Sequence, residues 1–256
     1  MAILEVLRVP VLHDNYVWLA HEATSGVTAA IDPAVVDPVL AALAEKGWTL
    51  THILNTHHHN DHTGGNLALK AKTGCTIVGS RTDRDRIPGI DIEVGEGDTY
   101  TLGKAMGRVF DVSGHTLGHI AYWFEESAAL FCGDTMFAMG CGRVIEGEFG
   151  QMLESLEKLK GLPGDTRVYC AHEYTQKNGQ FALTVEPQNP DLIARMRDVD
   201  DKRARDIATV PSRLDEEWKT NPFLRPDSPH LQETIGLAGA GLVDVFSEMR
   251  RRKDAF

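Results

Sequence analysis

The stretch that decides the fold reads Thr56-His57-His58-His59-Asn60-Asp61-His62. A strand is predicted immediately before it at Thr51–Asn55, and a helix is predicted after it from Thr63 to Lys72. At the residue frequencies of this chain, the pattern H-x-H-x-D-H would arise by chance about 10⁻³ times. The stretch therefore indicates a metal site rather than a loop that happens to be rich in histidine.

The direction of each side chain supports this reading. In a continuing extended chain, His57, His59 and Asp61 face the same way. His62 can rejoin them where the helix begins, because the chain direction breaks there. His58 faces the opposite way, so we expect it beside the site or at the surface.

Three further ligands stand just past predicted strands: His115 after Met106–Val112, Asp134 after Ala128–Cys132, and His172 after Arg167–Cys170. Each alone is as readily a capping aspartate or a hydrogen-bonded core histidine. Strand ends, however, converge at one rim of a sheet, where loops carry function. Together with the first stretch they make five histidines and two aspartates, which suits two metals that share a carboxylate.

The whole pattern resembles the metallo-β-lactamase superfamily and, within it, the glyoxalase II (hydroxyacylglutathione hydrolase) family. The metal motifs specify the superfamily, and the motifs near the end of the chain specify the family. The segments that carry the resemblance are Asp14-Asn15-Tyr16, Gly114-His115-Thr116 with His119, Phe131-Cys132-Gly133-Asp134-Thr135, Gly140-Cys141-Gly142-Arg143, Ala171-His172-Glu173-Tyr174-Thr175, Asn221-Pro222-Phe223, and Arg250-x-x-Lys253-Asp254.

The resemblance implies a binuclear centre in which one metal is bound by His57, His59 and His115, the second by Asp61, His62 and His172, and both by Asp134. Two divalent ions per chain are expected; zinc is the default, and the family also accepts iron and manganese. The implied reaction hydrolyses S-2-hydroxyacylglutathione, typically S-D-lactoylglutathione, to glutathione and D-lactate, the second step of methylglyoxal detoxification. A metal-bridging hydroxide would attack the thioester carbonyl. Asp61, which would orient that hydroxide, and Asp134 are the expected catalytic residues.

For the glutathione part of the substrate, the resemblance points to Arg143, Tyr174, Arg250 and Lys253. Glutathione carries two carboxylates, and Arg or Lys can pair with them. On a helix, Arg250 and Lys253 share a face. Some relatives carry an aromatic residue two positions after the basic residue, where this chain has Ile145. The loss of one hydrogen bond there is expected to cost about 0.5–1.5 kcal/mol of glutathione binding. Cys141 is expected to be a small buried residue rather than a catalytic thiol.

The order of the patterns predicts an α+β chain: a metallo-β-lactamase-like αββα sandwich, implied by the resemblance, followed by a smaller C-terminal helical domain. Residues 1–173 are expected to form the metal-binding catalytic domain, and residues 174–256 the helical glutathione-binding domain. Further strands are predicted at Leu4–Arg8, Tyr16–Ala20, Val27–Ile31 and His119–Phe124. Further helices are predicted at 35–46, 175–184, 189–207 and 239–252.

The composition narrows the partners. The 256 residues include 26 Lys+Arg and 37 Asp+Glu, a net charge of −11, which argues against non-specific binding of nucleic acid. The first ten residues lack the apolar run of a secretory signal, and no stretch is long enough to span a bilayer. The four cysteines form no CxxC pair, as expected of reduced thiols in the cytoplasm. We expect a monomer whose partner is a small glutathione thioester.

Four other functions agree less well with the sequence than the hydrolase does. A glutathione-persulfide dioxygenase with a mononuclear iron site shares the histidine motifs, but Arg250-x-x-Lys253 in a helical tail is not expected there. A β-lactamase is disfavoured because the common zinc forms carry Cys at the position of Asp134. A nucleic-acid processing enzyme, or a binding protein without activity, is disfavoured by the net charge and the complete set of ligands.

Overall fold

The computed structural model describes residues 3–256, which divide into two compact units. The first unit comprises the chain up to Asp111 together with Leu117–Gly133, and the second comprises Val112–Thr116 together with Asp134–Phe256. Met1 and Ala2 belong to the N-terminal segment that is predicted to lack a secretory signal, and they lie outside the described residues. The domain boundary expected at residue 173 stays a prediction.

The first unit is built on a mixed sheet whose strands run in the order β1-β2-β3-β4-β5-β6. Their bounds are β1 (Leu4–Val11), β2 (Asn15–Glu22), β3 (Val27–Ile31), β4 (His52–Leu54), β5 (Thr76–Ser80) and β6 (Ile92–Val94). Strands β1 to β3 pair antiparallel, whereas β3 to β6 pair parallel. The parallel strands therefore end at one edge of the sheet, where their following residues meet.

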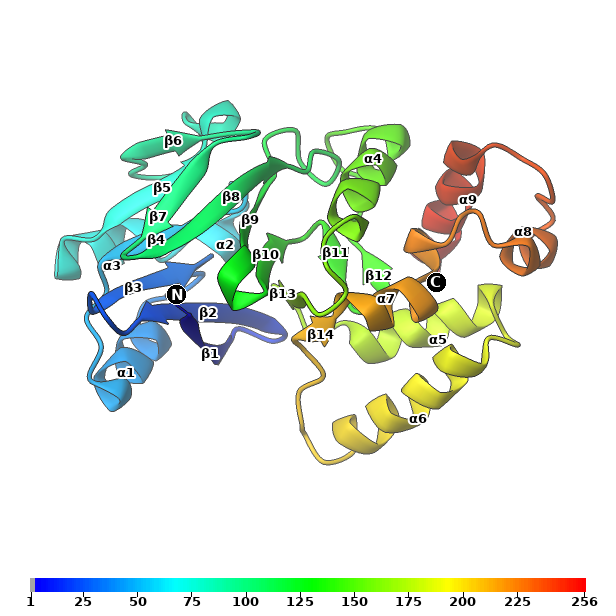
Figure 1. Ribbon diagram of the computed structural model, residues 1–256, viewed down its shortest axis with the longest axis horizontal. Helices are drawn as coiled ribbons and strands as arrows, with labels where there is room; N and C mark the ends of the chain where they lie inside the picture. The colour runs from blue at the N-terminus through cyan, green and yellow to red at the C-terminus, as the bar shows by residue number, and fades with distance from the viewer. Residues whose placement is uncertain (1–2) are drawn as a thin grey trace. The chain divides into compact units, whose positions relative to one another are not determined.

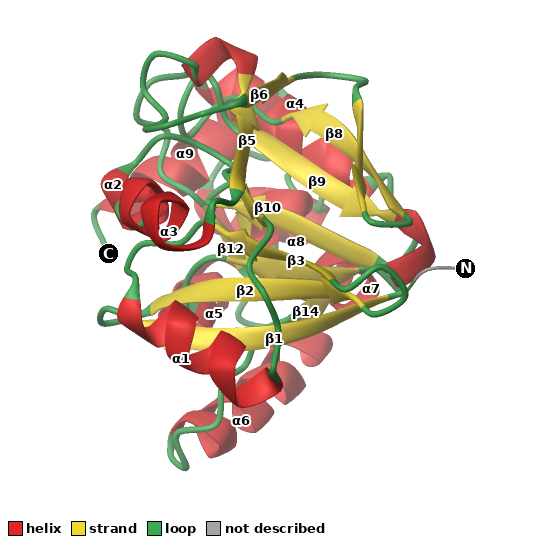
Figure 2. Ribbon diagram, turned by 90° about the vertical axis from the view of Figure 1, so that its left-hand side faces the viewer, coloured by secondary structure: helices red, strands yellow, loops and turns green. Residues whose placement is uncertain are grey.

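Helices α1 (Asp37–Lys46) and α3 (Asn66–Thr73) lie on one face of this sheet, as Figure 2 shows. Apolar side chains of the strands, among them Leu19, Ile53 and Ile77, pack there against Leu43 and Leu69. The unit also contains an antiparallel series in the order β10-β9-β8-β7. Its bounds are β7 (Thr99–Leu102), β8 (Ala105–Asp111), β9 (Ile120–Phe124) and β10 (Ala129–Gly133).

The second unit is mainly helical, with two short antiparallel strand pairs, β11·β12 and β13·β14. Its elements are β11 (Met136–Phe137), β12 (Gly140–Cys141), α4 (Phe149–Lys160), β13 (Arg167–Cys170), α5 (Thr175–Val185), α6 (Pro190–Arg203), β14 (Ser212–Arg213), α7 (Leu214–Thr220), α8 (Pro229–Ile235) and α9 (Leu242–Asp254). Helices α5 and α6 pack side by side through Ala182, Leu192 and Met196 (Figure 1). Within residues 3–256, none of the helices has the length and apolar character needed to cross a bilayer.

The helix predicted over Thr63–Lys72 is wrong in its continuity. The chain forms a short helix α2 (Asn60–Thr63), breaks, and resumes as α3. The break occurs at Gly65, where a Cβ would lie 2.7 Å from the carbonyl oxygen of Pro33, so the backbone passes too close for a side chain. Asp61 lies on the short helix α2, whereas the sequence suggested an extended chain at this position.

Candidate metal centre

Four of the predicted ligands come together in the first unit, just past β4. His57 follows the strand, His59 precedes α2, and Asp61 and His62 lie on that helix. The Nε2 atom of His57 lies 3.1 Å from Nδ1 of His59, and Nε2 of His62 lies 3.5 Å from Oδ2 of Asp61. His57 and His62 are buried, so their ring nitrogens are held in a dry environment.

Asp32 orients two of these histidines. It follows β3, whose Ile31 is paired with Leu54 of the parallel strand β4, so both strand ends deliver their residues to one place. The carboxylate accepts hydrogen bonds from Nδ1 of His62 at 3.2 Å and from the backbone and hydroxyl of Thr56 at 2.8 and 2.7 Å. Because the Thr56 hydroxyl donates to Asp32, its oxygen accepts from Nδ1 of His57 at 3.0 Å. Both histidines thus carry a proton on Nδ1 and present the lone pair of Nε2.

Two residues that are distant in sequence, Asn15 and His119, also contact this cluster. Asn15, at the start of β2, donates from its amide to Oδ2 of Asp61 at 3.1 Å, which fixes the direction of that carboxylate. His58 turns away from the ligands, as expected, and its Nδ1 lies 3.0 Å from Oδ2 of the buried Asp83. His119 stacks on the ring of His57 with centroids 4.5 Å apart.

The remaining three predicted ligands lie together in the second unit. Asp134 directly follows β10, and its two oxygens face different histidines: Oδ2 lies 3.6 Å from Nε2 of His115, and Oδ1 lies 3.3 Å from Nε2 of His172. Nδ1 of His115 donates to the carbonyl oxygen of Arg143 at 2.7 Å, which leaves its Nε2 as the lone-pair nitrogen. The ring of His172 is stacked on Tyr174, with centroids 4.6 Å apart.

These spacings fit metal ions. Two atoms bound at 2.0–2.1 Å to one tetrahedral zinc ion lie about 3.3 Å apart, and the four ligand pairs lie 3.1–3.6 Å apart. Imidazole and carboxylate donors suit zinc, iron and manganese. Asp32 also comes within reach of His57 and His62, but its oxygens already accept three hydrogen bonds, so we assign it to orienting them. The chain thus carries histidine and aspartate clusters of the kind that hold divalent metals.

The turn between Asp134 and Arg143 is held by side chains from the helices of the second unit. Asn221 donates to the carbonyl oxygens of Phe137 and Gly140 at 3.1 and 3.0 Å. Glu217 accepts from the backbone of Met139 at 2.8 Å. In the same turn, Asn178 donates to the carbonyl oxygen of Ala138, and Arg250 to that of Cys141. The helical part of the chain therefore fixes the backbone that carries Arg143, whose carbonyl orients His115.

A cavity of about 400 Å³ in the second unit contains all four residues predicted to bind glutathione, together with two predicted metal ligands. Its wall includes His115, Asp134, Phe137, Arg143, Tyr174, Lys177, Arg250 and Lys253. Predicted metal ligands and cationic side chains therefore line one and the same cavity.

Two residues of this wall are chemically perturbed. Burial, together with the positive charges of Arg250 and Lys177, lowers the pKa of Lys253 to about 8. Burial raises the pKa of the Cys141 thiol to about 11, which keeps it protonated at neutral pH. A protonated thiol is a poor nucleophile, so Cys141 is the small buried residue that the sequence suggested. Ile145 is exposed and donates no side-chain hydrogen bond, which leaves its predicted cost to binding in place.

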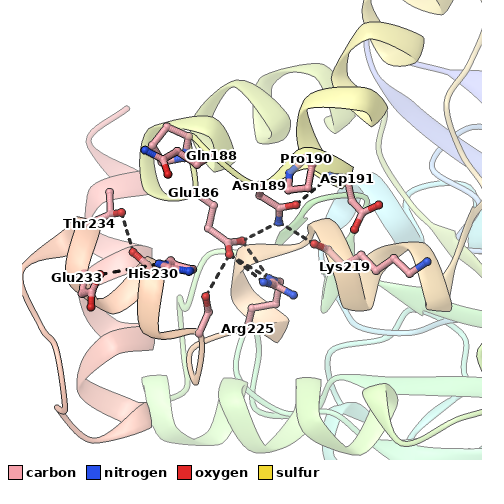
Figure 3. A pocket seen from close by; sticks show the side chains of 12 residues that line it. Glu186, Gln188, Asn189, Pro190, Asp191, Lys219, Arg225, His230, Glu233 and Thr234 are labelled. Carbon is pink, nitrogen blue, oxygen red and sulfur yellow. Dashed lines mark hydrogen bonds and ion pairs between the residues drawn. The ribbon is translucent and has the colours of Figure 1, made fainter.

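A larger cavity of about 500 Å³ lies elsewhere in the second unit (Figure 3). Its most buried charged group, Glu186, accepts from the Arg225 guanidinium at 3.0–3.1 Å and from Ser228 at 3.3 Å. Asn189 caps α6 by accepting from Asp191 and Leu192. These groups stabilise the wall of the cavity, and it contains none of the predicted ligands.

Sequence reasoning missed the residues that orient the ligands: Asn15, Asp32, Thr56, Asn178, Glu217 and Asn221. A signal existed for some of them. Asn15 and Asn221 lie in the segments that carry the family resemblance, and Asp32 stands directly after a strand, as Asp134 does. Glu217 and Asn178 lie within ordinary helical patterns, which give no such signal.

Two family models match the chain in succession. The model of the metallo-β-lactamase superfamily matches residues 22–172, and that of the hydroxyacylglutathione hydrolase C-terminus matches residues 173–256. Among solved structures, the BLEG-1 B3 metallo-β-lactamase is 20% identical with a TM-score of 0.66, and the likeness covers 86% of this chain and 100% of that one. This confirms the predicted fold class, a metallo-β-lactamase fold followed by a helical C-terminal part.

Curated relatives cover the whole chain at high identity. A hydroxyacylglutathione hydrolase of Methylococcus capsulatus is 59% identical over 253 residues, which is 99% of each chain. One of Rhodospirillum rubrum is 54% identical over 256 residues, which is the full length of both. With the ligand clusters and the cation-lined cavity in place, these full-length matches establish that the chain belongs to the hydroxyacylglutathione hydrolase family of the metallo-β-lactamase superfamily.

Proposed function

We propose that the chain hydrolyses S-2-hydroxyacylglutathione thioesters at a pair of divalent metals. The first metal would be held by His57, His59 and His115, the second by Asp61, His62 and His172, and both by Asp134. The observation that carries this proposal is the position of Asp134, whose two oxygens lie 3.6 and 3.3 Å from the Nε2 atoms of two different histidines. A carboxylate in that position suits a bridge between two ions.

Zinc is the metal we propose, because imidazole and carboxylate ligands at this spacing suit it; iron and manganese accept the same donors. A bound pair of divalent ions supplies a nucleophile from water at neutral pH and polarises the thioester carbonyl. Asp61, whose Oδ2 accepts a hydrogen bond from Asn15, would help to orient the attacking water. Asp134 would be the ligand that both ions share.

The side chains of the cavity then hold the substrate in place. Arg143, Tyr174, Arg250 and Lys253 would bind the peptide part of glutathione, so that its thioester lies against His115 and Asp134. The leaving group is a thiolate, whose conjugate acid has a pKa near 8.5, so it departs without a general acid. The buried Cys141 takes no part as a nucleophile.

Within the cell we propose that this reaction is the second step of methylglyoxal detoxification, that it releases D-lactate from S-D-lactoylglutathione, and that it takes place in the cytoplasm with the protein as a monomer. The relatives that carry the hydrolase name at 59% and 54% identity support this function over the persulfide dioxygenase.

Replacing single ligands tests the proposal. His57→Ala and Asp134→Ala should each lose bound metal and nearly all hydrolysis of S-D-lactoylglutathione. His230→Ala, at an exposed histidine outside the site, serves as the matched control and should keep both. Full metal content and full turnover in the ligand variants would contradict the proposed site.

A further inference from the structure

The cationic side chains that line the 400 Å³ cavity differ in how many hydrogen bonds and ion pairs they form within the protein. Arg250 is 3% exposed. Its guanidinium donates to the carbonyl oxygen of Cys141 at 2.8 Å and to Oδ1 of Asp254 at 2.9 and 3.2 Å. It also lies over the ring of Phe223 at 5.1 Å. Much of the hydrogen-bonding capacity of Arg250 is therefore spent on the wall of the cavity.

Lys177 differs from Arg250 in each respect. It lies in the first turn of α5, three residues after Tyr174, so the two side chains share one side of the helix. It lines the same cavity and is exposed. Among residues 3–256, no carboxylate pairs with it. Lys177 is thus a cation on the cavity wall that the fold leaves uncommitted.

Lys177 and Lys253 are neighbours. Nζ of Lys253 donates to the backbone carbonyl oxygen of Lys177 at 3.2 Å, so α9 sets one ammonium group beside the helix that carries the other. The lowered pKa of Lys253 reflects its burial and the nearby cations. Of the cavity's carboxylates, Asp254 is paired with Arg250 and Asp134 faces the histidines. Among residues 3–256, neither lysine forms an ion pair with one of these carboxylates, and two neighbouring cations of this kind form a site for an anion.

We propose that Lys177 is a substrate-binding residue which, together with Lys253, binds one carboxylate of the glutathione part of the substrate. The inference rests on the proposed function and adds to it a residue that the family motifs do not contain. Besides its proposed contact with the substrate, Arg250 donates to the carbonyl oxygen of Cys141 and so also stabilises the cavity wall. The two lysines supply the ammonium groups that an incoming carboxylate meets.

Kinetics of Lys177→Gln test the proposal. The variant should raise KM for S-D-lactoylglutathione roughly two- to fivefold, with kcat and metal content unchanged, because an exposed charge pair contributes modestly to binding. Lys72→Gln is the matched control: it removes the same charge from an exposed helical lysine outside the cavity, and its KM should equal that of the parent. An equal rise in KM for both variants would mean that only the overall charge matters, which overturns the proposal.

Modified substrates identify the contact. Two thioesters are compared, one amidated at the glycine carboxylate and one at the α-carboxylate of the γ-glutamyl residue. For one of them, Lys177→Gln should no longer change KM, because its binding partner is already missing. A full effect of the variant on both amides would refute contact with a carboxylate.

Binding of S-methylglutathione, which has no thioester, separates this inference from the proposed function. Calorimetry should show that Lys177→Gln weakens its binding by the same factor of roughly two to five. If the parent protein binds this compound through Lys177 but hydrolyses no thioester, the proposed function fails and the lysine site stands. If the parent hydrolyses thioesters and the variant binds S-methylglutathione as tightly as the parent does, the lysine site fails and the function stands.

Discussion

Asp32→Asn should weaken metal binding although Asp32 is not a proposed ligand. The carboxylate is 3% exposed, and both its oxygens accept hydrogen bonds: Oδ1 from the backbone of Thr56, and Oδ2 from the Thr56 hydroxyl and from Nδ1 of His62. An asparagine in either orientation turns its NH₂ group toward a donor. At least one buried hydrogen bond is lost, which costs about 1–3 kcal/mol of folding free energy.

The effect on metal binding follows from the same contacts. An asparagine lacks the negative charge of the carboxylate, so even with its oxygen toward Nδ1 it holds the His62 ring, and with it the lone pair of Nε2, less firmly toward a metal. Loss of such an orienting partner typically lowers metal affinity about 10- to 100-fold, which is about 1.4–2.7 kcal/mol. We expect an intermediate value, because His57 keeps its own contact with Thr56.

The assay is a competition for zinc between the metal-free protein and a chromophoric chelator, with circular dichroism to confirm folding. Asp37→Asn, at an exposed aspartate in the first turn of α1, is the control for the change of charge. A folded Asp32→Asn variant that binds zinc within about twofold of the parent would refute the reasoning, since the expected loss is at least tenfold.

Three further predictions concern the scaffold and the cavity. Asn221→Ala should lower the free energy of unfolding in urea by about 2–4 kcal/mol, because the buried carbonyl groups of the metal-side turn lose their donor; an unchanged midpoint would contradict this. Gly133→Ala should lose a similar amount, about 2–4 kcal/mol, because Gly133 has φ +48° and a Cβ there would overlap the Thr56 hydroxyl; a variant as stable as the parent would contradict it. Burial lowers the pKa of Lys253 to about 8, and a carboxylate binds the ammonium form more strongly, so affinity for S-methylglutathione should fall as the pH rises above about 8. Lys253→Gln should remove that pH dependence, and a parent protein whose affinity is flat between pH 7 and about 9.5 would contradict the assignment.

Local patterns were enough to predict the strands that carry the ligands. Val27–Ile31 and Arg167–Cys170 match β3 and β13 in full, since short β-branched or aromatic runs bounded by polar residues indicate strands. Helix α4 was not predicted, although it carries a capping box between Glu148 and Gln151. The predicted continuous helix after His62 failed because its break depends on the approach of Gly65 to Pro33, which are far apart in sequence.

The proposed ligands could be predicted from sequence because histidine and aspartate at this spacing are unusual and lie at or shortly after the ends of predicted strands. The role of Asp32 could not be predicted, because an aspartate next to Pro33 fits a turn residue as well as a residue that orients ligands. Its role arises only from the parallel pairing of β3 with β4, in which Ile31 lies opposite Leu54. Lys177 was missed for a related reason. Its proposed role depends on its contact with Lys253, which lies on another helix.

We propose that this chain is a thioesterase with two metals in one site. Zinc added stepwise to the metal-free protein, with bound metal and hydrolysis of S-D-lactoylglutathione followed in the same samples, tests this proposal. About two equivalents should bind per chain, and hydrolysis should reach its maximum only as the second is bound. Protein that holds two equivalents and hydrolyses no thioester, or that binds one iron and consumes oxygen with glutathione persulfide, would contradict it.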